Sequence, residues 1–120
     1  MRIRNLTQRK VVARRAKAAK NFFERLRGLI GRPRLKEGEA LWIPHCQGIH
    51  TFGMRYAIDV VFLDKKRRVV RAVQKIRPNV FGPTTFRADS ALELPSGTIR
   101  EKEIREGDCL SFIRERAAKS

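Results

Sequence analysis

The sequence holds one pair of side chains suited to proton transfer, His50 and Asp59. If residues 57–63 form a strand, alternation places Asp59 on a face shared with apolar side chains. A carboxylate in such surroundings must be paired, hydrogen-bonded or protonated, and His50 lies in the loop before the strand. Two interpretations stay open. In one, the pair transfers a proton in a cleft; in the other, which we favour, Asp59 is buried and holds the loop 50–56 by accepting its hydrogen bonds.

A candidate ligand cleft surrounds this pair and consists of His50, Thr51, Met54 and Asp59. Met54 lies in the run 52–56, where aromatic residues and a thioether alternate with glycine and arginine. Such a run could stack on a ligand or a nucleic-acid base. It is more often an ordinary strand with one face in the core, and we favour that interpretation.

A second cluster, made of His45, Cys46 and His50 with the distant Cys109, carries the imidazole and thiolate groups that zinc prefers. Its spacing argues against a metal site, because neighbours on a strand point to opposite faces. The two cysteines form no C-x-x-C pair, and the sequence offers no third group to orient His50 toward Cys46 as a nucleophile. We expect no metal, no cofactor and two buried free thiols, with Cys46 only half-buried.

Charge is the strongest signal in the composition. The chain has 28 Lys and Arg against 12 Asp and Glu, a formal net charge of +16 and a pI of about 11.3. This balance favours a polyanionic partner. Residues 1–27 hold ten basic side chains and one acidic one, and a second basic run lies at 65–68. We expect weak, salt-sensitive contacts with phosphates from Arg14, Arg15, Lys17, Lys20, Lys65, Lys66, Arg67 and Arg68.

Helical periodicity is confined to one window near the start of the chain. Apolar residues recur at intervals of three and four, which predicts one amphipathic helix within 16–31 with basic side chains outside the apolar stripe. Gly31 and Pro33 end it. Residues 10–15 could equally form a short strand. The stripe consists of Val12, Ala16, Ala19, Phe23, Leu26 and Ile30.

From residue 40 onward, short β-branched and aromatic runs between turn residues predict an antiparallel sheet. We expect a hairpin tip at 64–67 that is wider than the tightest turns, because it has no glycine. The predicted fold is mainly β, a small antiparallel β-sandwich or barrel-like domain with one N-terminal amphipathic helix. A single domain covers 1–120, with flexible basic tails at 1–9 and 114–120. Strands are expected near 40–45, 57–63, 67–75, 91–94 and 108–113.

Four sequence blocks are recognisable together: G-L-I-G-R at 28–32, I-H-T-F-G-M-R-Y-A-I-D-V-V-F-L-D at 49–64, L-E-L-P-S-G at 92–97, and G-D at 107–108. Across about residues 10–113 the chain thereby resembles domain-of-unknown-function family 192 (DUF192). The resemblance implies a small β-sandwich-like fold with a short N-terminal helix, and no established enzyme activity or cofactor. The chain departs from the family pattern at 65–68, where a turn with a glycine is usual, and in its basic start.

No stretch of the sequence approaches the roughly 20 apolar residues of a membrane span. Charged side chains interrupt residues 1–20, so we expect no secretory signal and a cytoplasmic protein. The sequence favours a non-catalytic binding module that contacts nucleic acid or another polyanion through its basic N-terminal helix. The alternative is a small-ligand-binding or catalytic domain with a cleft around His50, Met54 and Asp59.

Overall fold

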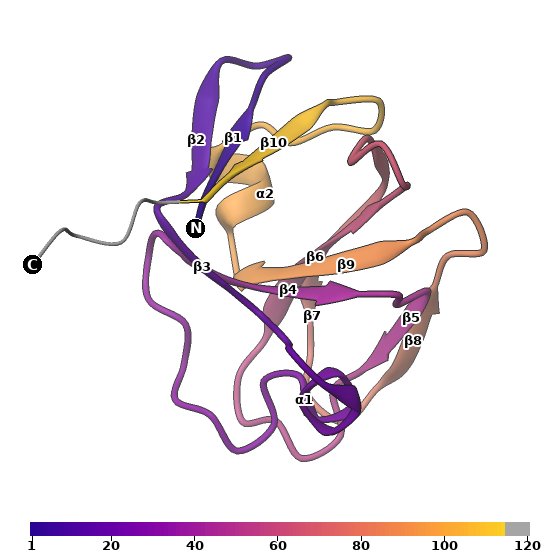
Figure 1. Cartoon of the computed structure of the whole chain (residues 1–120). Coiled ribbons are helices and arrows are strands. Elements are labelled where there is room, and N and C mark those ends of the chain that lie inside the picture. The colour runs from indigo at the N-terminus through magenta and orange to yellow at the C-terminus, as the bar shows by residue number, and fades with distance from the viewer. Residues whose placement is uncertain (115–120) are drawn as a thin grey trace, which may run out of the picture.

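The computed structural model describes residues 1–114, which form two β-sheets, a two-stranded ribbon and two short helices (Figure 1). The three-stranded sheet has the order β10-β1-β2, the five-stranded sheet β3-β4-β9-β6-β7, and the ribbon pairs β5 with β8. Their bounds are β1 Arg2–Asn5, β2 Lys10–Ala13, β3 Arg15–Ala18, α1 Phe22–Arg27, β4 Glu39–Pro44, β5 Gly48–His50, β6 Ile58–Leu63, β7 Val69–Ile76, β8 Phe81–Thr84, β9 Ser90–Pro95, α2 Thr98–Glu101 and β10 Leu110–Ile113.

The centre of the molecule is the antiparallel pair β6 and β9 of the five-stranded sheet. All six residues of β6 are buried, which explains its nearly continuous apolar sequence. Alternation divides the two strands between two core clusters, one on each face of the sheet. Val61, Leu63, Leu92 and Leu94 pack in the cluster that also holds Ile99 of α2; Ile58, Val60, Phe62 and Ala91 pack in the cluster that also holds Leu29.

The prediction of a mainly β fold is confirmed, and each of the five predicted strands has a counterpart shifted by at most two residues at either end. Residues 1–114 form several antiparallel or mixed sheets that do not close into a sandwich or a barrel. The hairpin tip is wide, as expected. Asp64 Oδ1 accepts hydrogen bonds from the backbone N–H groups of Lys66 and Arg68, and Arg67 takes the positive φ of 61° that a glycine would otherwise supply.

The predicted helix within 16–31 is wrong in extent. Residues 15–18 form β3, which pairs in parallel with β4, and within the window 16–31 only α1 is helical. In β3, Ala16 is buried between the exposed Arg15 and Lys17, a period of two that the helical stripe concealed. Within the predicted stripe, Phe23 is 79% exposed and Leu26 60% exposed, so α1 does not bury that face.

The start of the chain is also not a flexible tail. Ile3 in β1 is fully buried, and the N-terminal ammonium donates a hydrogen bond of 3.0 Å to the carbonyl of Ala16. The Asn5 side chain donates to Asp108 Oδ2 at 2.8 Å, which links β1 to the turn before β10. Residues 1–9 therefore belong to the folded structure. Of the second predicted tail, residues 115–120 lie outside the described part of the chain.

Candidate functional site

Asp59 is buried, as predicted, but its hydrogen-bond partners differ from those expected. Its Oδ1 accepts from the backbone N–H of Lys75 at 2.8 Å, and its Oδ2 accepts from those of Gly97 at 3.0 Å and Ile99 at 2.9 Å. The prediction that Asp59 holds the loop 50–56 is therefore wrong, because its donors come from β7 and from the start of α2. With these donors satisfied, the carboxylate has a structural role and makes no pair with His50.

The other members of the predicted cleft are dispersed. Thr51 is fully buried, donates to the carbonyl of Arg77 at 2.7 Å and accepts from the N–H of Val80 at 2.9 Å. Met54 is 6% exposed and packs in the core, although it also reaches the lining of a surface hollow. His50 lies in the β5–β8 ribbon, its ring centroid 5.8 Å from that of Phe52. His50, Thr51 and Asp59 are absent from the lining of that hollow.

The two cysteines are free and half-buried, which was expected for Cys46, whereas Cys109 was expected to be buried. Cys46 Sγ donates to the carbonyl of Gly48 at 2.9 Å, and burial raises the pKa of its thiol. A raised pKa keeps the thiol protonated, which is the opposite of what an activated nucleophile requires. Within residues 1–114, no three His, Cys, Asp or Glu side chains lie close enough together to hold a metal ion.

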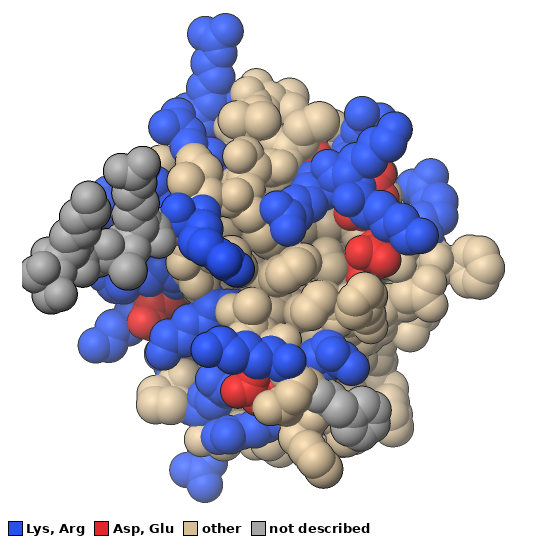
Figure 2. All heavy atoms as spheres, in the orientation of Figure 1, with Lys and Arg blue, Asp and Glu red and all other residues tan. Residues whose placement is uncertain are grey.

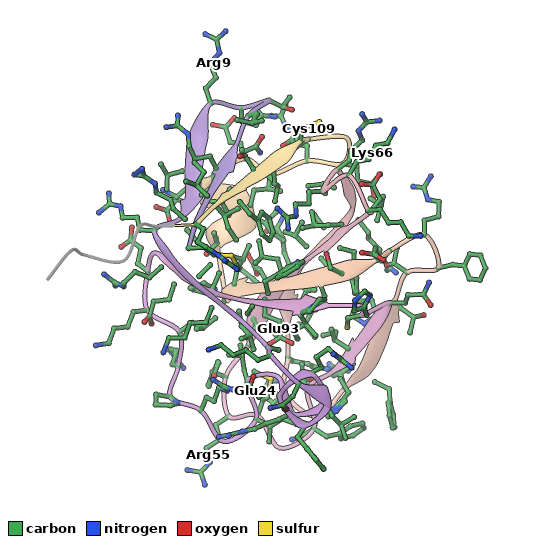
Figure 3. All side chains as sticks on the ribbon, viewed as in Figure 1. Arg9, Glu24, Arg55, Lys66, Glu93 and Cys109 are labelled. Atoms are coloured by element: carbon green, nitrogen blue, oxygen red, sulfur yellow. The ribbon has the colours of Figure 1, made fainter. Side chains whose placement is uncertain are left out.

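Glu93 is the buried titratable group that the sequence analysis missed. It lies on β9 between Leu41 of β4 and Val60 of β6, and it is 3% exposed. Its Oε2 is buried and has no hydrogen-bond partner among the described residues. Figure 3 shows Glu93 at the middle of the sheet, beside α1. The chain passes over the carboxyl at Gly28, where a Cβ atom would lie 3.1 Å from Glu93 Oε1.

Burial raises the pKa of Glu93 to about 8, and the positive charge of Arg32 opposes this shift. At neutral pH the carboxyl is therefore mostly protonated and can donate a hydrogen bond. Arg32 is not satisfied within the protein either, because its Nε is buried without a hydrogen-bond partner in the described residues. Two buried polar atoms without partners, Arg32 Nε and Glu93 Oε2, thus belong to groups that interact electrostatically, and such unsatisfied atoms are unusual in a folded protein.

Two hollows flank residues 29–34, the segment that follows Gly28. Both are lined by Leu29, Arg32, Pro33 and Arg34. The first, of about 540 Å³, extends to Met54 and Tyr56. The second, of about 530 Å³, extends to β3 and β4 and has five cationic side chains against one acid. Its charged lining consists of Arg15, Lys17, Arg32, Arg34, Lys36 and Glu39.

The predicted basic residues are mostly accessible, but no helix presents them. Arg14, Arg15, Lys17 and Lys20 are all exposed, and they lie along β3 and the segments that flank it. Figure 2 shows Lys and Arg side chains across the lower half of the visible face, and again at its upper right, where Figure 3 places Lys66.

In the hairpin-tip group, Lys65, Lys66 and Arg68 are exposed. Arg67 differs, because its guanidinium lies 4.1 Å from the ring centroid of Phe112 and 5.2 Å from that of Trp42. Arg67 is therefore held against an aromatic pair by a cation–π interaction, and only three members of this group remain available to a partner.

The residues around Glu93 do not indicate that its side chain is buried. In Leu92-Glu93-Leu94, a charged residue between two leucines is typical of a strand with one solvent-facing side. That interpretation fails because β9 is central and the turn that follows α1 lies against the second face at Gly28. One signal was present: Gly28, Arg32 and Glu93 all fall within the blocks that carry the family resemblance.

Comparisons with known proteins agree on one family and give no activity. The model of DUF192, described as "Uncharacterized ACR", matches residues 3–112. A UPF0127 protein of Thermococcus sibiricus is 35% identical over 108 residues, which cover 87% of this chain and 70% of that protein.

Two crystal structures share the fold. One, a protein of unknown function from Novosphingobium aromaticivorans, has a TM-score of 0.78 at 20% identity and covers 92% of this chain and 82% of its own. The other, a Sinorhizobium meliloti protein suggested to be a transcription regulator, has a TM-score of 0.77 at 15% identity and covers 92% and 89%. Over residues 1–114, no helix is both long and apolar enough to cross a membrane.

Proposed function

This chain belongs to the DUF192 family, and we propose that within it the protein is a non-catalytic module that binds nucleic acid or another polyanion through the basic edge formed by Arg14, Arg15, Lys17 and Lys20. The observation that carries the proposal is that all four side chains are exposed along one extended segment. The proposal includes a cytoplasmic location, where nucleic acid is abundant.

The geometry of β3 suits a phosphate backbone. Arg15 and Lys17 are two residues apart on one face of an extended strand, so their Cα atoms are roughly 6 to 7 Å apart. One strand of duplex DNA carries a phosphate about every 3.4 Å along the helix axis, so the two cations span about two phosphates. β3 is the edge of its sheet. On its outer side the backbone of Ala16 bonds with Met1, while the side chains of Arg15 and Lys17 stay exposed.

Such contacts carry charge but no means to distinguish bases. We expect a dissociation constant on the order of 10⁻⁴ to 10⁻⁶ M at physiological salt, with little dependence on sequence. Glu39, which pairs with Arg15 across β3 and β4, lowers the local positive potential. This acid is a further reason to expect weak binding.

Fluorescence anisotropy of a labelled DNA duplex across a salt series tests the proposal. The logarithm of the binding constant falls with the logarithm of salt concentration by about 0.9 per phosphate contacted. The double variant Lys17→Ala/Lys20→Ala is expected to flatten that slope by nearly two units. Lys65→Ala/Lys66→Ala at the hairpin tip removes the same charge elsewhere and serves as the matched control.

Two results would contradict the proposal in different ways. If no binding is measurable even at low salt, where a protein of charge +16 has its best chance, the polyanion hypothesis is wrong. If the hairpin-tip variant flattens the slope and the β3 variant does not, the protein binds polyanions through the tip, and the basic edge is not the interface.

A further inference from the structure

The hollow bordered by residues 15–17, 29–36 and 39–41 differs in character from the flat basic edge. Its floor and walls include apolar side chains, Leu29, Leu35 and Leu41, while cations surround it. The one acid in the lining, Glu39, accepts a hydrogen bond from the backbone N–H of Lys36 at 2.6 Å. The hollow therefore offers apolar surface and uncompensated positive charge together.

Arg32 and Arg34 both line the two hollows, and Arg32 is the less exposed of the two. The turn that carries it is internally bonded: Arg27 Nε donates to the carbonyl of Ile30 at 2.8 Å, and the N–H of Arg32 donates to the carbonyl of Leu29 at 3.0 Å. These bonds hold the backbone of the turn. The guanidinium Nε nevertheless remains buried without a partner in the described chain.

A buried unpaired guanidinium nitrogen is costly, and structures normally satisfy it. Glu93 does not do so, since its own Oε2 is unpartnered and its raised pKa keeps it mostly neutral. Arg32 also lines the hollow, and its guanidinium is well suited to bind a phosphate or carboxylate with two oxygens. The leucines beside it would cover an attached hydrocarbon chain.

We propose that this hollow binds a free small molecule with one phosphate or carboxylate group on a short apolar chain, with Arg32 holding the anionic group. The site shares Arg15 and Lys17 with the proposed duplex interface and extends beyond it to Arg32 and Leu35. It also differs from the cleft that the sequence predicted, because His50, Thr51 and Asp59 do not line it.

Isothermal titration calorimetry of the full chain with octyl phosphate, below the concentration at which it forms micelles, tests this proposal. We expect saturable one-site binding that is at least tenfold tighter than that of inorganic phosphate, which lacks the chain, or octyl glucoside, which lacks the charge. Amide chemical shifts in NMR spectra are expected to change mainly within residues 29–41.

Arg32→Gln should weaken octyl phosphate binding at least tenfold. Arg87→Gln is the matched control, because Arg87 is exposed and lines a different hollow beside Lys65 and Lys66. Arg34 is an exposed residue of the lining, so Arg34→Gln should weaken binding two- to threefold. This variant provides a second test if Arg32→Gln fails to fold.

Several results would overturn the proposal: equal losses in the Arg32 and Arg87 variants, equal affinities for octyl phosphate and inorganic phosphate, or binding to vesicles of anionic lipid without saturable binding of octyl phosphate. The proposal is separate from duplex binding. Octyl phosphate binding that depends on Arg32 supports the small-molecule site even if no duplex binds. Duplex binding without octyl phosphate binding supports only the basic edge.

Discussion

Asp59 and Glu93 are two buried carboxyl groups on neighbouring strands of one sheet, and they have opposite surroundings. Asp59 pairs across β6 and β9 with Leu94, and Glu93 pairs with Val60, the next residue along β6. Because adjacent positions point to opposite faces, the two carboxyls lie on different sides of the sheet. Asp59 accepts three backbone hydrogen bonds, whereas Glu93 Oε2 has none among the described residues.

The difference shows that burial alone does not assign a role to a carboxyl group. On the Asp59 side, the turn into α2 supplies N–H groups that stabilise a negative charge. On the Glu93 side, the turn after α1 supplies Gly28 at close range and an arginine that forms no hydrogen bond through its Nε. The first arrangement holds the fold together; the second leaves polar groups free near two hollows, as ligand sites often do.

The largest expected effect is the pH dependence of stability caused by Glu93. Its pKa is raised from 4.5 to about 8 in the folded protein, so the folded state favours the protonated form. The stabilisation is fully present below pH 4.5 and is lost as pH rises to about 8. Between pH 5 and pH 9 the loss amounts to roughly 3 to 5 kcal/mol.

Urea denaturation of the wild-type protein and of Glu93→Gln across this pH range measures the effect. Glutamine has the same shape but does not titrate, so the two stability curves should diverge as pH rises and run parallel above about pH 8.5. Cys46 and Tyr56 also have raised pKa values, mainly through burial, which is the same in both proteins. The charge of Glu93 adds to both shifts, so a small part of the difference near the alkaline end of the range comes from this coupling. Curves that stay parallel from pH 5 to pH 9 would show that Glu93 is ionised normally.

The second-largest expected effect is the destabilisation caused by removing the carboxylate of Asp59, the hydrogen-bonded member of the two buried acids. Asp59→Ala leaves three backbone N–H groups without their acceptor, and we expect a destabilisation of roughly 2 to 4 kcal/mol. Asp59→Asn retains an oxygen acceptor and should lose less. Thermal or chemical denaturation at pH 7 provides the measurement, and an unchanged melting temperature in Asp59→Ala would contradict the structural role.

The sequence predicted the strands that carry an unambiguous pattern and failed where two patterns coincide. The run at 58–63 is apolar on both faces, and its position was predicted within one residue. In contrast, Arg15-Ala16-Lys17-Ala18 fits a helical stripe as well as an alternating strand. Pairing with β4 decides between them, and such a long-range contact is absent from local propensity.

The candidate site could also be predicted only in part, because long-range contacts decide its geometry. Burial of Asp59 followed from its apolar neighbours, but its partners Gly97 and Ile99 lie about forty residues away in the sequence and could not be inferred from the adjacent loop. Burial of Glu93 could not be predicted, because alternation does not reveal whether a strand is central or at an edge. Only the placement of the turn at Gly28 over β9 makes it a buried acid.

The smallest expected effect concerns the glycine that separates Glu93 from solvent. Gly28 has φ 54° and ψ −124°, a conformation that side chains disfavour, and a Cβ there would come within 3.1 Å of Glu93 Oε1. Gly28→Ala should therefore destabilise the protein by about 1 to 2 kcal/mol through backbone strain and this contact.

Gly107→Ala is a useful control, because Gly107 has φ 91° with open space around the added methyl group. Its cost should come from the backbone alone. Combining each substitution with Glu93→Ala separates the two causes: removing the carboxyl should recover part of the loss at Gly28 and none at Gly107. Equal, uncoupled losses at the two glycines would mean that Gly28 is required only for its backbone conformation, and that the close approach to Glu93 has no energetic consequence.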